Sequence, residues 1–187
     1  MPVRSVAGRL LLSAPLALAV WVVFRAPLGG AVRGVTVAAL RAVGERAHVS
    51  PASDRVAIAV QPAREGAPRT RIFGCSLMRW HVNLVALPIL AASFGTIGAR
   101  GRLLLCLLGV PLVLVLDGCS VALHLLLGAA RLRGEPWLGA TLDRNLDYGI
   151  AVYGAKLIPV AVWGGLYLGL AAARGRVRRT SMARRVS

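Results

Sequence analysis

Acidic residues, lysines and aromatic side chains are scarce in this chain, and their scarcity limits what it can be. Of 187 residues only 7 are Asp or Glu, against 23 Lys and Arg, and Lys156 is the single lysine among those 23. Charged residues make up 16% of the chain and hydrophobic residues 57%, which is too apolar for an ordinary soluble domain of this size. The composition therefore predicts an integral membrane protein.

The formal net charge of +16 raises nucleic-acid binding as a function, but the placement of the arginines argues against it. They lie beside apolar runs and at the C-terminal end, and the sequence carries none of the usual nucleic-acid-binding motifs. A lipid bilayer with anionic headgroups is the partner that this distribution indicates.

Cysteine is scarce as well. Cys75, Cys106 and Cys119 form no CxxC pair and have no nearby histidine at metal-ligand spacing, which argues against a zinc site and a disulfide scaffold. Cys106 and Cys119 lie inside an apolar run, where cysteine usually acts as a small hydrophobic side chain. We expect no metal and no cofactor.

Long apolar runs predict a mainly α fold, an integral membrane four-helix bundle with a small extracytoplasmic segment. Each of the last three spans can cross a hydrocarbon core of about 30 Å at about 1.5 Å per residue. The first has a signal-sequence layout without a clear cleavage site, so we expect an uncleaved anchor. The expected parts are an N-terminal anchor helix within 1–28, a membrane region over 81–173 with spans at 82–99, 103–130 and 148–173, and a basic tail over 174–187.

The segment 29–80 combines a helical pattern with a strand pattern. Residues 31–47 place Val32, Val35, Ala39 and Val43 on one stripe, which predicts an amphipathic helix at the membrane surface. Beyond it Val56, Ile58 and Val60 alternate with small residues, and the stretch 71–75 can run back after a turn at 65–68. A short β-hairpin is predicted.

Arginines on the short flanks predict the orientation in the membrane. Two precede the first span, two lie in the 99–102 turn and six in the tail, whereas basic and acidic residues balance in the 131–147 loop. By the positive-inside rule the first three flanks face the cytoplasm. We expect a multi-pass protein of the bacterial inner membrane with both termini cytoplasmic, and with 29–80 and 131–147 outside.

Polar residues inside the predicted spans are the first candidate site. Asn83, Asp117 and Lys156 come from three helices at similar depth, and His124 shares the helix face of Asp117 because it follows seven residues later. Intramembrane ionisable residues indicate function by default. Three interpretations stay open: a structural ion pair of Asp117 with Lys156, a cluster that binds a substrate or partner, and snorkelling without contact.

Small residues recur every fourth position along the last span and predict a helix-packing seam. The seam could serve the bundle itself or a partner protein. Its members are Ala161, Gly165, Gly169 and Ala173.

Cys75, Arg79 and His81 lie close together before the second predicted span. A nearby cation can activate a thiol, and membrane transpeptidases of the exosortase type use a cysteine with an arginine and a histidine. Those enzymes draw the three groups from separate helices, whereas here they crowd one stretch. We expect no catalytic residues and no enzyme.

The stretches RWHVNLVALPILAASFGTIGARGRLLLCLLG and KLIPVAVW, with the order of the predicted parts, resemble the small exosortase-associated membrane proteins of bacteria, of the exosortase H-associated type. An asparagine starts the second span, a basic turn leads into the third, and a basic residue stands three before a proline in the fourth. The matching residues are Asn83, Arg100, Arg102, Lys156 and Pro159. Asp117 departs from the pattern, in which a histidine is commoner.

The resemblance implies an accessory of an envelope protein-sorting system rather than the sorting enzyme. We expect a non-enzymatic scaffold that contacts a larger, exosortase-like membrane protein through the segment 29–80 and the seam. The alternatives are a small ion- or proton-coupled transporter or channel subunit, in which Asp117 and Lys156 line a path, and a cysteine transpeptidase.

Overall fold

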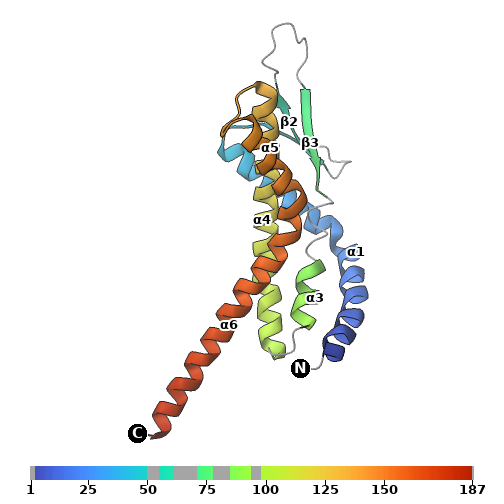
Figure 1. Ribbon diagram of the computed structural model, residues 1–187. Coiled ribbons are helices and arrows are strands. Elements are labelled where there is room, and N and C mark those ends of the chain that lie inside the picture. Colours follow the sequence, from blue (N-terminus) through green and yellow to red (C-terminus); the bar gives the residue numbers. More distant parts are fainter. Residues whose placement is uncertain (1–2, 50–54, 61–70, 78–84, 94–97, 187) are drawn as a thin grey trace.

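The computed structural model describes residues 3–49, 55–60, 71–77, 85–93 and 98–186 (Figure 1). The described part is mainly helical (80%), with five α-helices and a small three-stranded sheet. In chain order the elements are α1 (Val3–Ala42), β1 (Ala47–Val49), β2 (Arg55–Val60), β3 (Arg71–Ser76), α3 (Ala86–Ser93), α4 (Ala99–Arg133), α5 (Ala140–Gly149), a π-helical turn (Ile150–Gly154) and α6 (Ala155–Val186).

Helix α4 is the central element of the molecule. Its 35 residues extend about 50 Å at about 1.5 Å per residue, which exceeds the thickness of a hydrocarbon core of about 30 Å. The other long helices α1 and α6 and the short α3 pack along it, while the sheet and α5 contact its C-terminal part (Figure 1). The end of the molecule that carries the sheet and α5 is called the sheet end below.

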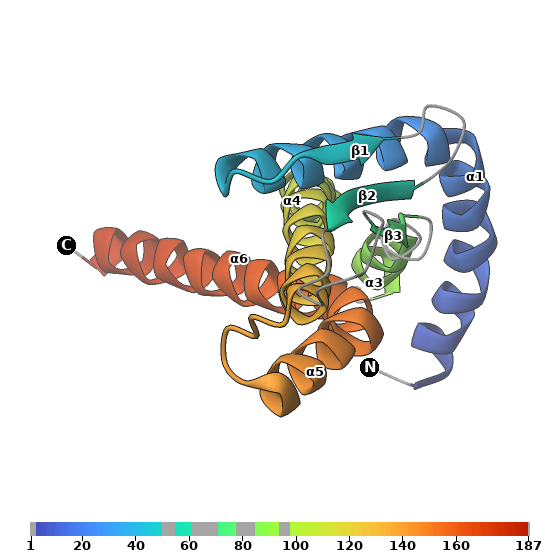
Figure 2. The ribbon, with the colours of Figure 1, turned by 90° about the horizontal axis from the view of Figure 1, so that it is seen from above.

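Helix α1 is one continuous helix, which corrects two predictions. The anchor expected within 1–28 and the separate amphipathic helix expected at 31–47 join without a break and end at Ala42. The helix bends near its middle, so that its C-terminal half crosses α4 beside β1 (Figures 1 and 2). Pro27 accounts for the bend, because proline removes a backbone N–H and its ring clashes with the preceding turn.

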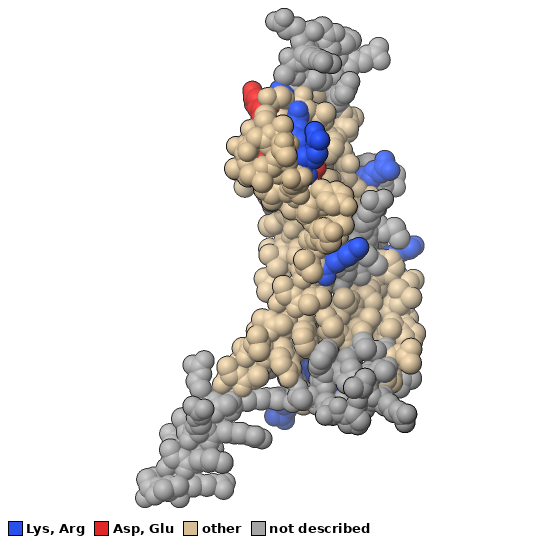
Figure 3. All heavy atoms as spheres, viewed as in Figure 1, with Lys and Arg blue, Asp and Glu red and all other residues tan. Residues whose placement is uncertain are grey.

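Three helices of the described part are long and apolar enough to span a membrane: Ser13–Ala42, Ala99–Arg133 and Lys156–Ala173. They are consistent with a multi-pass membrane protein. Many large apolar side chains on these helices are exposed, as a surface in contact with lipid requires. On the face shown in Figure 3, Asp and Glu atoms are visible only at the sheet end.

Within the second predicted span, 82–99, the structure describes one helix, α3, which has eight residues. Residues 78–84 and 94–97, and the hairpin turn predicted at 65–68, lie outside the described residues. Helix α3 contacts α1, α4 and α6. The described residues do not confirm a bundle of four membrane-spanning helices.

Two glycines of α4 allow its neighbours to approach closely. A Cβ atom on Gly118 would lie 2.6 Å from the side chain of Val35 on α1, and one on Gly109 would lie 2.7 Å from Leu87 on α3. A larger residue at Gly118 would force α1 away, because the Val32 carbonyl oxygen also lies 3.1 Å from that position, whereas at Gly109 the end of the Leu87 side chain would have to shift. These packing positions were not predicted from the sequence, which pointed to α6 instead.

The predicted hairpin is confirmed as the antiparallel pair of β2 and β3, with Val56 opposite Cys75 and Ile58 opposite Phe73. Strand β1 adds a third, unpredicted strand, so that the order is β1-β2-β3. Val56, Ile58 and Val60 are 0% exposed and belong to the core cluster that includes the C-terminal part of α4. The alternation seen in the sequence therefore separates a buried face from an outer face.

Helix α5 occupies much of the loop predicted at 131–147. Before it α4 ends, and Gly134 adopts the left-handed conformation (φ 78°) that commonly closes a helix. The carboxylate of Asp143, in the first turn of α5, accepts hydrogen bonds from the backbone N–H groups of Trp137 and Leu138 at 2.8 and 3.0 Å. The connection is thus anchored to the helix that follows it.

The last predicted span also has different bounds. The helical chain begins at Ala140, before the predicted start at 148, and passes through the π-helical turn into α6. Helix α6 then continues to Val186 through the predicted tail.

Candidate functional site

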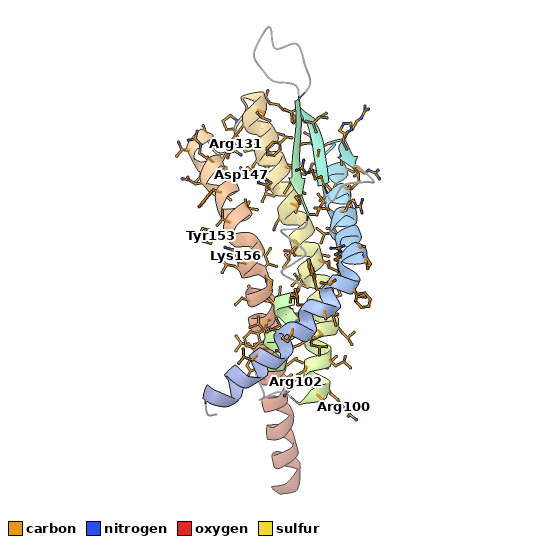
Figure 4. All side chains as sticks on the ribbon, turned by 90° about the vertical axis from the view of Figure 1, so that its right-hand side faces the viewer. Arg100, Arg102, Arg131, Asp147, Tyr153 and Lys156 are labelled. Atoms are coloured by element: carbon orange, nitrogen blue, oxygen red, sulfur yellow. The ribbon has the colours of Figure 1, made fainter. Side chains whose placement is uncertain are left out.

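A cluster of charged side chains joins the C-terminal part of α4 to α5. Asp147 on α5 accepts hydrogen bonds from His124 Nδ1 through Oδ1 and from Arg131 Nη2 through Oδ2. Asp147 is 7% exposed, so these donors satisfy a carboxylate that has almost no contact with solvent. Figure 4 shows Arg131 and Asp147 together near the sheet end.

Strand β3 packs beside this cluster. Phe73 and Cys75 lie on the same face of β3, and that face packs against α4. The ring of Phe73 lies with its centroid 5.8 Å from that of His124 and occupies the space beside Gly128, one helical turn farther along α4. The thiol of Cys75 points its Sγ to the carbonyl oxygen of Ser76, at 3.6 Å.

His124, Arg131 and Asp147 thus form a polar network that joins α4 to α5, and strand β3 packs beside it. The carboxylate of Asp147 fixes the orientation of the imidazole and of the guanidinium that it binds.

No group of three or more His, Cys, Asp or Glu side chains within the described ranges could hold a metal ion.

The predicted polar cluster takes a different form. Asp117 is 0% exposed, whereas Lys156 is exposed, and these two described side chains form no ion pair. His124 pairs with Asp147. Asn83 lies outside the described residues. Counting along the helices placed these residues at one depth, but the rotation of α6 about its axis directs Lys156 to the outside.

Asp117 is buried where α4 meets α1. Neither of its carboxylate oxygens has a hydrogen-bond partner in the described part of the chain. The next residue, Gly118, contacts α1 directly: the hydroxyl of Thr36 lies 3.1 Å from the Gly118 carbonyl oxygen and 2.8 Å from that of Val32. The polar contact across this crossing thus goes to Thr36, while the carboxyl group of Asp117 stays unsatisfied.

The predicted seam on α6 does not pack inside the chain. All four of its residues are exposed: Ala161, Gly165, Gly169 and Ala173. A Cβ atom on Gly165 or Gly169 would meet nothing within 4 Å. Helix α6 uses another side for internal packing, where Val162 contacts Leu87 and Val113. Between the two readings of the seam, internal packing is not observed in the described structure.

Of the Cys75, Arg79 and His81 stretch only Cys75 is described, since the other two lie outside the described residues. Cys75 lies opposite Val56 in the sheet, and its Sγ lies 3.6 Å from the carbonyl oxygen of Ser76. Sequence reasoning missed Asp147 and Arg131. A weak signal existed, because Arg131 follows His124 by seven residues and so shares its helix face.

A second ion pair at the sheet end joins the last residue of α4 to a residue just after α1. Arg133 donates to Glu45 from Nη1 to Oε1 at 2.5 Å and from Nη2 to Oε2 at 2.9 Å. This hydrogen bonding by the Arg133 guanidinium lowers the pKa of the Glu45 carboxyl below its usual range, against the opposing effect of burial. The carboxylate form of Glu45 is therefore favoured in the folded chain.

No protein-family model matches this chain, and no curated protein or solved structure shows significant similarity to it.

Proposed function

We propose that this chain is a non-enzymatic accessory protein of the bacterial inner membrane, which serves an exosortase-type envelope protein-sorting system by contacting a larger membrane protein. Its apolar helices anchor it, and the sheet end projects from the membrane. The sequence resemblance suggests the system, and the exposed surface of α6 suggests the contact.

The exposed small-residue seam on α6 is the observation that carries the proposal. The seam residues from Ala161 to Ala173 lie within a helix segment that is long and apolar enough to span a membrane, and all four are exposed. Small residues spaced by four favour close approach of another helix backbone in lipid. Figure 1 shows that α6 diverges from α4 toward its C-terminal end.

The arrangement of the ends supports the proposed orientation. Both chain ends lie at the end of the molecule opposite the sheet (Figure 1). Arg100 and Arg102 lie at that same end in Figure 4, away from Asp147. Together with the positive-inside rule, this favours a cytoplasmic side for both termini and an extracytoplasmic side for the sheet. A four-helix membrane region, completed by the segment around α3, is part of the proposal.

The test is capture of a membrane partner by the full-length tagged chain after cross-linking in native membranes and extraction in mild detergent. We expect Gly165→Leu to reduce recovery of an exosortase-like protein at least about tenfold, since a bulky side chain blocks close helix approach. Ala171→Leu is the matched control, because Ala171 is exposed on another side of α6. Its recovery should equal that of the unmodified chain.

Both variants should accumulate in the membrane at normal levels, since neither position is packed inside the chain. Capture of no membrane protein by the unmodified chain would refute the proposal. Equal recovery with Gly165→Leu would remove the seam from it.

A further inference from the structure

Helix α5 buries its acidic side chains and exposes its large apolar ones, which reverses the arrangement of a helix that faces water. Asp143 and Asp147 are buried, whereas Leu142 is 51% exposed and Leu146 is 37% exposed. Both carboxylates are used inside the chain, since Asp147 binds side chains of α4 and Asp143 binds backbone N–H groups before α5. Leu142 and Leu146 are called the leucine flank below.

Arg144 lies on the opposite side of α5 from the leucine flank. Successive residues of an α-helix are turned by about 100°, so Asp143 and Asp147 share one side. Leu142 and Leu146 each precede one of these aspartates, and Arg144 lies about 200° from either leucine. Arg144 is exposed as well. Helix α5 thus has a buried acidic side, an exposed apolar flank and an exposed cation across from that flank.

The course of α5 shows which way the leucine flank is turned. Viewed from the sheet end, α5 lies lengthwise in the picture, and α4 is on its left when α5 is followed from its N-terminal end (Figure 2). Asp147 faces α4, to which it is hydrogen-bonded. Because an α-helix is right-handed, the residue before each aspartate then points away from the viewer. The leucine flank is therefore turned toward the apolar spans, and Arg144 is turned away from them.

Helix α5 docks on α4 at the level where the apolar surface of α4 ends. The large exposed apolar side chains of α4 extend from Leu103 to Leu123. This stretch measures about 30 Å at about 1.5 Å per residue, which is the thickness of a hydrocarbon core. His124, the next residue, binds Asp147 on α5. Helix α5 therefore lies where the lipid headgroups begin.

Aromatic side chains mark the same level. Trp137 and Tyr148 are exposed at the two ends of α5, and Tyr153 is exposed three residues before Lys156, where a candidate span begins. Figure 4 shows Tyr153 and Lys156 on the side of Asp147 that is farther from the sheet end. The rings of Tyr148 and Tyr153 meet edge to face, with 6.5 Å between centroids. Tryptophan and tyrosine are enriched at the boundary between membrane and water.

We propose that α5 is an interfacial helix, whose leucine flank inserts between the lipid headgroups and contacts the acyl chains of the bilayer. Lipid is the occupant because the exposed apolar side chains continue from the flank into Leu157 and Val160, at the start of a candidate span. The inference rests on the membrane placement in the proposed function but needs no partner protein. Helix α5 thereby fixes the depth at which α6 enters the membrane.

Spin labels on opposite sides of α5 test the proposal. The full-length chain is first freed of cysteine by Cys75→Ala, Cys106→Ala and Cys119→Ala, since these are its three cysteines. Leu142→Cys or Arg144→Cys then gives one labelling position. The purified, labelled chains are placed in liposomes of phosphatidylcholine and phosphatidylglycerol. Electron paramagnetic resonance measures the exposure of each label to oxygen, which concentrates among acyl chains, and to a nickel chelate, which stays in water.

We expect the label at residue 142 to lie about 5–10 Å inside the headgroup boundary and to respond more to oxygen than to the nickel chelate. The label at residue 144 is the matched control and should respond more to the nickel chelate. Equal exposure of the two labels to the nickel chelate would overturn the proposal, and the leucine flank would then be left to a protein. Leu146→Cys repeats the measurement on the same flank, so the test does not depend on one variant.

A label on α4 separates failure of this inference from failure of the proposed function. Leu108 is exposed within the apolar stretch of α4, so a label introduced by Leu108→Cys should be shielded from the nickel chelate. If residue 108 is shielded and residue 142 is in water, only the interfacial role of α5 is overturned. If both are in water, the membrane placement fails and this inference fails with it. Capture of a partner plays no part in these measurements.

Discussion

Arg133, the last residue of α4, donates two hydrogen bonds to Glu45, which lies just beyond the end of α1. The distances are 2.5 Å from Nη1 to Oε1 and 2.9 Å from Nη2 to Oε2. The two residues are 88 positions apart in the chain. A guanidinium and a carboxylate that meet at two points fix the angle between their elements as well as the distance. The pair therefore sets where the end of α1 lies relative to α4.

The ion pair of Glu45 with Arg133 should make the thermal stability of the chain depend on pH. The pKa of Glu45 is lower in the folded chain than in the unfolded chain, where it is about 4.3. The ion pair therefore stabilises the fold fully above about pH 4.3, and this stabilisation is lost as the pH falls through the folded-state pKa. We expect Glu45→Gln to lower Tm by about 2–4 °C at pH 7, for a loss of about 1 kcal/mol. The difference from the unmodified chain should shrink as the pH falls below the unfolded pKa and vanish once Glu45 is protonated in the folded chain.

Melting in detergent at several pH values, followed by circular dichroism, provides the measurement. In the Glu45→Gln background Arg133→Gln should add little, because the pair is already broken. A pH-independent difference would show that Glu45 acts by another route.

Enlarging Gly118 should destabilise the crossing of α1 and α4. A Cβ atom there would lie 2.6 Å from the Val35 side chain and 3.1 Å from the Val32 carbonyl oxygen, so the helices must move apart. We expect Gly118→Ala to cost about 1–3 kcal/mol. Gly165→Ala is the control, since nothing lies within 4 Å of a Cβ there and alanine favours helix over glycine. A lower Tm for Gly118→Ala alone, in the same detergent, is the expected result.

Replacing Asp117 should stabilise the chain. Both carboxylate oxygens are buried without a hydrogen-bond partner in the described structure, and burial of such a group costs free energy. Asp117→Leu, which is similar in size, should raise the free energy of unfolding by about 1–3 kcal/mol. Urea unfolding in mixed micelles measures the change. A decrease would mean that Asp117 is paired, and would reopen the ion-pair interpretation.

Asp143 contrasts with Asp117, because it is equally buried but both of its carboxylate oxygens accept hydrogen bonds. Its carboxylate accepts the N–H groups of Trp137 and Leu138 at 2.8 and 3.0 Å. Asp143→Ala leaves these donors without a partner and should cost about 2–3 kcal/mol. Hydrogen exchange of the amides of residues 137 and 138 should accelerate at least about tenfold. Thr141→Ala, at an exposed position of the same helix, should change neither quantity.

Local patterns carried the predictions that succeeded. The alternation of Val56, Ile58 and Val60 indicated a strand with one buried face, and these three residues are indeed buried against α4. The third predicted span lies within α4, because a long apolar run has few alternatives to helix. Both signals depend on neighbours in the sequence, so they can be read without the fold.

The predicted bounds of the first helix were wrong. The apolar run predicts an anchor within 1–28, but α1 continues to Ala42 through a bend. A proline costs one helical hydrogen bond, and packing against α4 and α3 offsets that loss. The sequence does not report how much packing a helix will gain.

What the sequence by itself determined is the class: apolar helices that can span a membrane, a short hairpin, and an excess of arginine. Only the tertiary structure decided which side chains meet. It left Lys156 exposed and Asp117 buried without a hydrogen-bond partner in the described residues, and it brought His124 on α4 to Asp147 on α5. Helix rotation and the docking of α5 set these contacts, and both arise from packing between segments distant in the chain.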